Sequence, residues 1–197
     1  MNKSRLEAFS DGVIAILITI MVLELRIPHG DDLSALSPLF PVFLSYILSF
    51  IYLGIYWNNH HHMLQATVHI NGGILWANLN LLFWLSLFPF TTGWMGENHF
   101  APLPTATFGA VLLAAAISYT ILQTLIMRYN KGENTKLKQA IGADLKGKLS
   151  LVFYVVAIPL AFVNQWVSAA LYVLVAAIWL VPDRRIERTI QIASADE

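Results

Sequence analysis

The protein has 197 residues, of which 57% are hydrophobic and only 12% are charged. About a quarter of the residues of a soluble domain are charged, because polar side chains must cover its surface. The composition therefore predicts a membrane protein. Twelve basic residues balance twelve acidic ones, which excludes a nucleic-acid-binding module that relies on net positive charge. The lack of cysteine excludes disulfides, thiolate catalysis and cysteine-ligated metal sites.

Six apolar stretches approach the length of roughly 20 residues that a helix needs to cross a hydrocarbon core about 30 Å thick. We therefore expect an all-α membrane protein with a single domain over residues 1–197. Only Asn164 and Gln165 separate the last two stretches, which predicts a tight hairpin whose first helix is bent by Pro159; one long helix is the alternative. The expected spans are residues 8–25, 39–57, 73–92, 105–127, 149–164 and 166–181.

The basic residues test this count, because Lys and Arg concentrate on the cytoplasmic side of a membrane. Two precede the first span, six lie between the fourth and fifth, and three follow the sixth. With six spans and a cytoplasmic N-terminus, eleven of the twelve fall inside, and only Arg26 falls outside. The distribution favours six crossings with both termini in the cytoplasm. Among the lysines of the fourth loop, a four-residue spacing predicts an amphipathic helix on the inner leaflet: Leu137, Ile141, Leu145 and Leu149.

The first span contains an ionisable residue, Asp11. Such a group costs at least about 2.5 kcal/mol in a span unless it faces protein or water, so Asp11 is expected to face the interior of the bundle. A buried carboxylate needs hydrogen-bond donors. The candidate donors near the cytoplasmic end are Arg5, Ser10, Trp57, the run His60-His61-His62, Trp76, Asn78 and Asn80.

A second face of the first span carries aliphatic side chains and one hydroxyl. Ile16, Thr19, Ile20 and Leu23 follow the i, i+3, i+4, i+7 spacing of one helix face. Asp11 lies roughly 140° away from Ile16 around the helix. For an arbitrary membrane helix, such a face is usually packed against another helix or against lipid.

The motif R-x-x-x-F-S-D at residues 5–11 resembles the signature of the transmembrane protein 175 family, the lysosomal potassium channels and their prokaryotic relatives. Residues 57–61, with a Trp followed by His-His, and residues 75–79 and 87–90 resemble the second and third helices of that family in order and spacing. Six helices and this length fit the single-repeat prokaryotic members. The resemblance covers essentially the whole chain.

The resemblance implies a channel and not an enzyme. It implies a homotetramer in a prokaryotic cell membrane, with four copies of the first helix around a pore for K⁺ and other monovalent cations, in contact with lipids and without a cofactor. In such channels the constriction is hydrophobic, at positions that match Ile16, Ile20 and Leu23, and Thr19 matches a threonine that contributes to selectivity. The residues that would brace the pore helix without touching ions are Arg5, Phe9, Ser10, Asp11, His60, His61, Trp76 and Asn78.

A ring of aliphatic side chains at a symmetry axis loses water readily and gates by dewetting. Ions then pass only after partial dehydration, which penalises the more tightly hydrated Na⁺ more than K⁺. The acceptor lone pairs of Thr19 offset part of the loss. Because the sequence has no T-V-G-Y-G run, no carbonyl filter replaces a full hydration shell, and we expect the preference for K⁺ to be modest.

Two other functional classes are compatible with parts of the sequence. A metalloenzyme would use His60, His61, His62 and His69, but three consecutive histidines spread over about 200° of a helix, and no acidic residue lies between Asp32 and Glu97 to complete a site. A proton-coupled transporter would relay protons through Asp11 and the histidines.

The outer end of the first span leaves some residues without a firm role. Glu24 and Arg26 either concentrate cations or simply flank the span, and flanking is favoured. His29 and His99 lie in predicted outer loops and receive no role.

Overall fold

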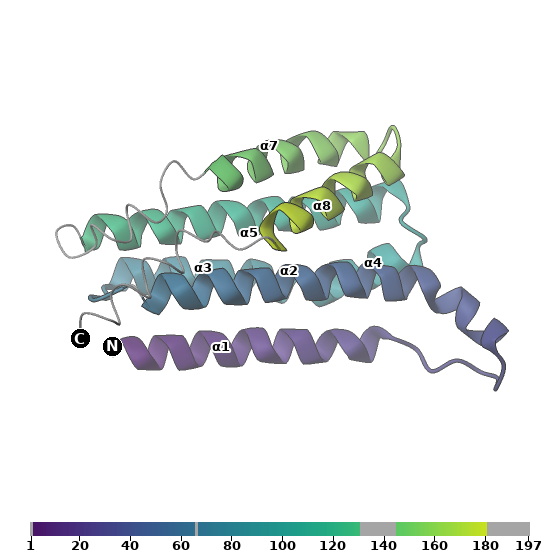
Figure 1. Ribbon diagram of the computed structural model, residues 1–197, viewed down its shortest axis with the longest axis horizontal. Coiled ribbons are helices and arrows are strands. Elements are labelled where there is room, and N and C mark those ends of the chain that lie inside the picture. The colour runs from purple at the N-terminus through teal and green to yellow at the C-terminus, as the bar shows by residue number, and fades with distance from the viewer. Residues whose placement is uncertain (1, 66, 131–144, 181–197) are drawn as a thin grey trace.

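The computed structural model describes residues 2–65, 67–130 and 145–180, and within them the chain is helical without a strand. The helices run antiparallel along one axis (Figure 1). The expectation of an all-α protein is confirmed. The α-helices are α1 (Lys3–Ile20), α2 (Phe40–Gln65), α3 (Gly72–Ser86), α4 (Phe88–Glu97), α5 (Pro102–Tyr129), α7 (Leu145–Leu160) and α8 (Gln165–Leu180), and two 3₁₀ helices, η1 (Met21–Glu24) and η2 (Leu33–Leu39), follow α1 and precede α2.

Among the described residues, four continuous stretches are long and apolar enough to cross a membrane: Lys3–Glu24, Leu33–Gln65, Gly72–Glu97 and Pro102–Tyr129. They agree with the first four expected spans, but the third was expected as one helix over residues 73–92. The chain instead breaks at Leu87 between α3 and α4. Pro89, in the first turn of α4, has no backbone N–H to continue the ladder of α3, and its ring favours the start of a new helix.

The last two helices form the predicted hairpin, since the chain turns back between Leu160 and Gln165 (Figure 1). The Asn164 side chain caps α8 by accepting a hydrogen bond of 3.0 Å from the backbone N–H of Trp166. The alternative of one long helix is therefore wrong. Each helix has 16 residues, or about 24 Å, so full membrane crossing by this hairpin stays a prediction.

With the exception of Arg26, the described basic residues gather at one end of the bundle, where α1, α3 and α7 begin and α2 and α5 end (Figure 1). Arg26 lies at the opposite end, paired with Glu97 at 2.6 Å. This separation agrees with the charge distribution read from the sequence. The predicted amphipathic helix falls largely outside the described residues, and of its leucines Leu145 and Leu149 belong to the first turns of α7.

Close helix packing requires glycine at Gly96, near the end of α4. A Cβ there would lie 2.7 Å from the Cα of Val42 and would also overlap the Ser45 hydroxyl, and backbone atoms cannot move aside cheaply. Gly54 in α2 has no atom within 4 Å of the same position.

We therefore expect Gly96→Ala to destabilise the protein by about 1–3 kcal/mol through overpacking. Gly54→Ala, the matched control, should be neutral or stabilising by up to about 1 kcal/mol, because alanine favours a helix. Thermal unfolding of both variants in detergent measures the difference. Equal melting temperatures for the two variants would contradict the close contact between α2 and α4.

Candidate functional site

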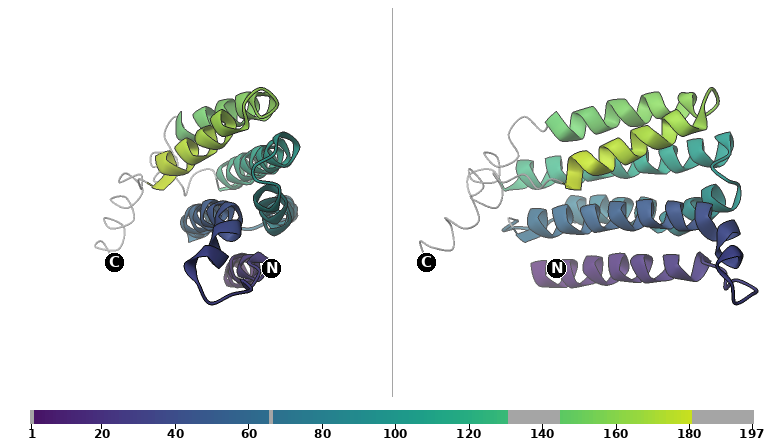
Figure 2. Two further views of the ribbon diagram at one scale, coloured as in Figure 1. Left: turned by 90° about the vertical axis from the view of Figure 1, so that its right-hand side faces the viewer. Right: turned by 45° about the vertical axis from the view of Figure 1, so that its right-hand side comes forward.

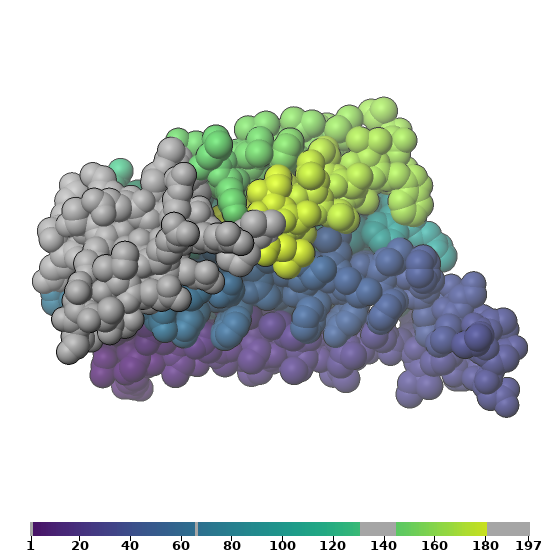
Figure 3. All heavy atoms as spheres, in the orientation of Figure 1, coloured from purple at the N-terminus to yellow at the C-terminus, as the bar shows by residue number. Residues whose placement is uncertain are grey.

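The helix α1 forms an outer edge of the bundle, where it packs against α2 and α3 and leaves its other side open (Figures 1, 2 and 3). Its buried side follows helical spacing: Leu6, Ser10, Ile14 and Leu17. The opposite side carries what we call the α1 stripe. The α1 stripe consists of Ile16, Thr19, Ile20 and Leu23, all of them exposed in the single chain, with 57%, 40% and 77% exposure at Ile16, Ile20 and Leu23.

The hydroxyl of Thr19 is oriented by its own helix. It donates its hydrogen to the backbone carbonyl of Ile16 at 2.9 Å, with the carbonyl of Ala15 at 3.1 Å. The hydrogen is therefore occupied inside the helix, and the oxygen lone pairs remain available to a donor or a cation.

At the outer end of α1, the helix tightens into η1 and both charged residues contact their own chain. The Glu24 carboxylate lies against Gly93 of α4, where an added Cβ would meet its Oε2 at 3.1 Å. Arg26 donates to Glu97. These contacts support the interpretation of Glu24 and Arg26 as flanking residues.

Behind the α1 stripe, three buried polar side chains join three helices. The Asn78 amide of α3 donates through Nδ2 to the Ser10 hydroxyl of α1 at 3.0 Å, and its Oδ1 lies 2.7 Å from Nε2 of His60 in α2. Because an amide oxygen only accepts, His60 carries its hydrogen on Nε2. All three side chains are at most 1% exposed and hydrogen-bonded to protein, while Nδ1 of His60 has no partner among the described residues.

Asp11 lies at the edge of these three buried side chains. One of its carboxylate oxygens accepts a hydrogen bond of 3.0 Å from the indole N–H of Trp57 in α2. The Trp57 ring stacks on His61, with ring centroids 5.8 Å apart and 21° between the planes. We call the set formed by Ser10, Asp11, Trp57, His60 and Asn78 the α1 anchor. Its members come from α1, α2 and α3 and connect the three helices near the basic end of the bundle.

Four of the residues that the resemblance assigned to the brace lie outside the α1 anchor: His61, which stacks on Trp57, and Arg5, Phe9 and Trp76. Phe9 and Trp76 are 50% and 75% exposed, and within the described residues the Arg5 side chain makes no hydrogen bond or ion pair. Trp76 lies about 200° from Asn78 around α3, so it faces outward when Asn78 faces α1.

The packing of the helices shows which of the other candidate donors reaches Asp11. Asn80 donates to Ser118 of α5 at 2.7 Å and not to Asp11. The donor to Asp11 is Trp57, to which the resemblance assigned no role. Its indole N–H, at the inner end of the second span, had placed it among the candidate donors. Among the described residues no group of three or more His, Asp or Glu side chains is placed to hold a metal ion.

Comparisons with known proteins identify the family. Residues 5–89 match the sequence model of the family described as endosomal/lysosomal potassium channel TMEM175. A protein of Chryseobacterium sp. (strain P1-3) named as a potassium channel is 56% identical over 191 residues, which cover 97% of this chain and 99% of that protein. This chain belongs to the TMEM175 family. A potassium channel of Streptomyces collinus is 28% identical and covers 89% of this chain and 91% of its own length.

The fold agrees with the family. The crystal structure of a lysosomal potassium-selective channel TMEM175 homolog from Chamaesiphon minutus superposes with a TM-score of 0.78 at 26% identity and covers 92% of this chain and 97% of that chain. The resemblance drawn from the motifs is confirmed, and the chain is a multi-pass protein of the cell membrane. The segment that matches the family model contains both the α1 stripe and the α1 anchor.

Proposed function

We propose that this chain forms a potassium-permeable cation channel in which four copies of α1 surround the ion pathway, with Ile16, Ile20 and Leu23 as its hydrophobic constriction. The observation that carries the proposal is the exposed α1 stripe on a helix whose opposite side is held by buried hydrogen bonds. The names of the bacterial relatives and of the solved homolog supply the permeant ion.

The α1 anchor supports this arrangement because it fixes the rotation of α1 about its own axis. Ser10 and Asp11 are bonded to α2 and α3, so the α1 stripe is presented away from the rest of the chain. Four such stripes around an axis make stacked aliphatic rings with a hydroxyl ring between them. The aliphatic rings set the barrier by dewetting, and the Thr19 oxygens replace part of the lost hydration.

Reconstitution of the purified protein in liposomes tests this proposal. A potassium gradient should drive flux that is larger than the flux of Na⁺ and much larger than that of a bulky organic cation. Uptake that is steeply coupled to a proton gradient, without channel openings in planar bilayers, would instead favour the proton-coupled transporter.

The same assay tests the role of Thr19. Thr19→Val keeps the shape of the side chain and removes its oxygen, so the permeability ratio of K⁺ over Na⁺ should fall towards unity while flux persists. Thr107→Val is the matched control, since the Thr107 hydroxyl also donates to a carbonyl of its own helix, that of Leu103 at 2.9 Å, and Thr107 belongs to α5. An unchanged ratio in Thr19→Val would remove its hydroxyl from the ion pathway.

A further inference from the structure

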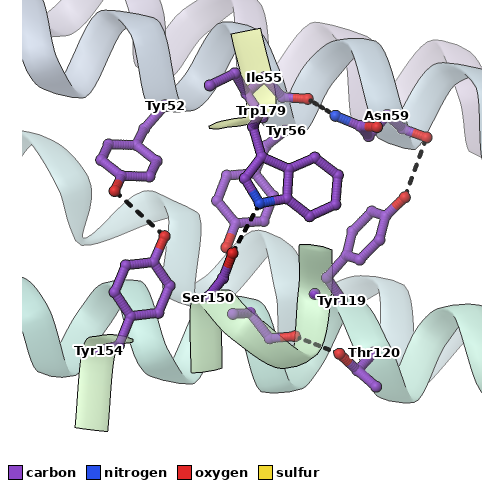
Figure 4. A pocket seen from close by; sticks show the side chains of 11 residues that line it. Tyr52, Ile55, Tyr56, Asn59, Tyr119, Thr120, Ser150, Tyr154 and Trp179 are labelled. Atoms are coloured by element: carbon purple, nitrogen blue, oxygen red, sulfur yellow. Dashed lines mark hydrogen bonds between the residues drawn. The ribbon is translucent and has the colours of Figure 1, made fainter. Parts of the chain in front are cut away.

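A partly open cavity of about 50 Å³ lies between α2, α5, α7 and α8 (Figure 4). None of its lining residues belongs to α1, and it adjoins the face of α2 opposite to Trp57. It is therefore separate from the α1 stripe and from the α1 anchor, and its contents do not depend on where ions pass.

The described residues that line the cavity are uncharged. Aromatic rings from all four surrounding helices dominate, and the other described lining residues are small, aliphatic or neutral polar. Since this part of the wall has no carboxylate and no basic side chain, it offers nothing to balance the charge of an ion. It therefore suits a neutral molecule.

The wall nevertheless presents hydrogen-bonding groups. Tyr56 is only 9% exposed, and within the described residues its hydroxyl makes no hydrogen bond. Asn59 uses its Nδ2 on the carbonyl of Ile55 at 2.8 Å, which leaves its Oδ1 without a donor from the described chain. Tyr154 donates to Tyr52 at 3.3 Å and keeps a lone pair free to accept. A hydroxyl left unpaired in a membrane-embedded bundle is costly, because no solvent there replaces the lost bond.

We propose that this cavity is a binding site for ordered water that bridges Tyr56 to polar groups on the neighbouring helices. The size favours water, because about 50 Å³ exceeds the roughly 10–15 Å³ that a cavity needs to hold a water molecule and falls well below the about 150 Å³ of a cavity that accepts a benzene ring. The bound water satisfies the Tyr56 hydroxyl and ties α2 to α7. Thus α2 is held on one face by the α1 anchor and on the other by the water site.

Substitution of Tyr56 by phenylalanine tests the proposal through the sign of its effect. If water is bound, Tyr56→Phe removes a hydrogen bond and should lower the melting temperature of the detergent-solubilised protein by about 2–4 °C. If the cavity is dry, the same change deletes an unsatisfied hydroxyl and the melting temperature should rise. Tyr46→Phe on the same helix is the control and should leave it unchanged, because Tyr46 is half-buried, does not line the cavity and has no hydrogen-bond partner within the described residues.

A structure of the full chain at a resolution that shows ordered water provides the second readout. Density within hydrogen-bond distance of the Tyr56 hydroxyl is expected in the unmodified protein and should be lost or displaced in Tyr56→Phe. A dry cavity, a cavity filled by a detergent or lipid chain, or a rise in the melting temperature of Tyr56→Phe would each overturn the proposal. Ion flux is not part of this test, so its outcome is distinguishable from that of the proposed channel function.

Discussion

Ile16→Asn is expected to raise the potassium flux of reconstituted protein about tenfold. Ile16 is the innermost aliphatic residue of the α1 stripe and is 57% exposed in the single chain. At a symmetry axis, four isoleucines would expel water, and four asparagine amides would retain it and lower the barrier to a hydrated cation. A tenfold change corresponds to about 1.4 kcal/mol of barrier. Flux into liposomes at matched protein density, together with single-channel current, measures the effect.

Val22→Asn is the matched control, because Val22 is also an aliphatic residue of the first span, 47% exposed, and lies outside the α1 stripe. Its flux should equal that of the unmodified protein. A comparable gain in both variants would show that a polar side chain anywhere on the exposed surface causes leakage. Unchanged current in Ile16→Asn would mean that another segment lines the pathway, and the channel mechanism proposed for α1 would fail.

Asn78→Leu is expected to lower the free energy of unfolding more than the glycine and tyrosine substitutions described above. Its amide is fully buried and serves Ser10 with Nδ2 and His60 with Oδ1, so leucine leaves a hydroxyl and an imidazole unpaired at once. At about 1–3 kcal/mol for each unsatisfied group, the free energy of unfolding should fall by about 2–6 kcal/mol. Because Ser10 belongs to α1, the orientation of the α1 stripe should be lost as well. Thermal unfolding and size-exclusion chromatography in detergent report the two effects.

Asn80→Leu separates this effect from the general cost of replacing asparagine in α3. Asn80 is two residues away, is exposed, and makes one hydrogen bond, to Ser118. Its loss should cost less than half as much and should leave the chromatographic profile unchanged. If Asn80→Leu is as damaging as Asn78→Leu, the bonds of the α1 anchor do not account for the position of α1.

Part of the site is predictable because helical periodicity is a local property. The exposed positions of the α1 stripe follow from the spacing of Ile16, Ile20 and Leu23, and the structure shows these side chains exposed on one face. The placement of Asp11 away from Ile16 follows from the same angles, and the structure confirms it by the bond to Trp57. Their role in conduction rests on the proposed function.

Other parts of the site could not be predicted from the sequence pattern, because they depend on which helices pack against each other. Helical periodicity does not distinguish Asn78, which is buried between α1 and α2, from Asn80, which bonds to α5; only the motif behind the resemblance singled out Asn78. The inclusion of Trp76 in the brace followed from the motif, but the rotation that buries Asn78 turns Trp76 outward. The break at Leu87 was missed because the hydropathy continues across it.

The amino-acid sequence by itself determined that the protein lies in a membrane, that it is helical, at which end its basic residues gather, and to which family it belongs. Hydropathy, helical period and motif spacing are encoded residue by residue. The tertiary structure decided which donor satisfies Asp11, that Trp76 faces away from α1, where the third span breaks, and that a largely aromatic cavity lies behind α2. These features depend on the rotation and register of helices distant in the chain, and only the packed bundle determines those.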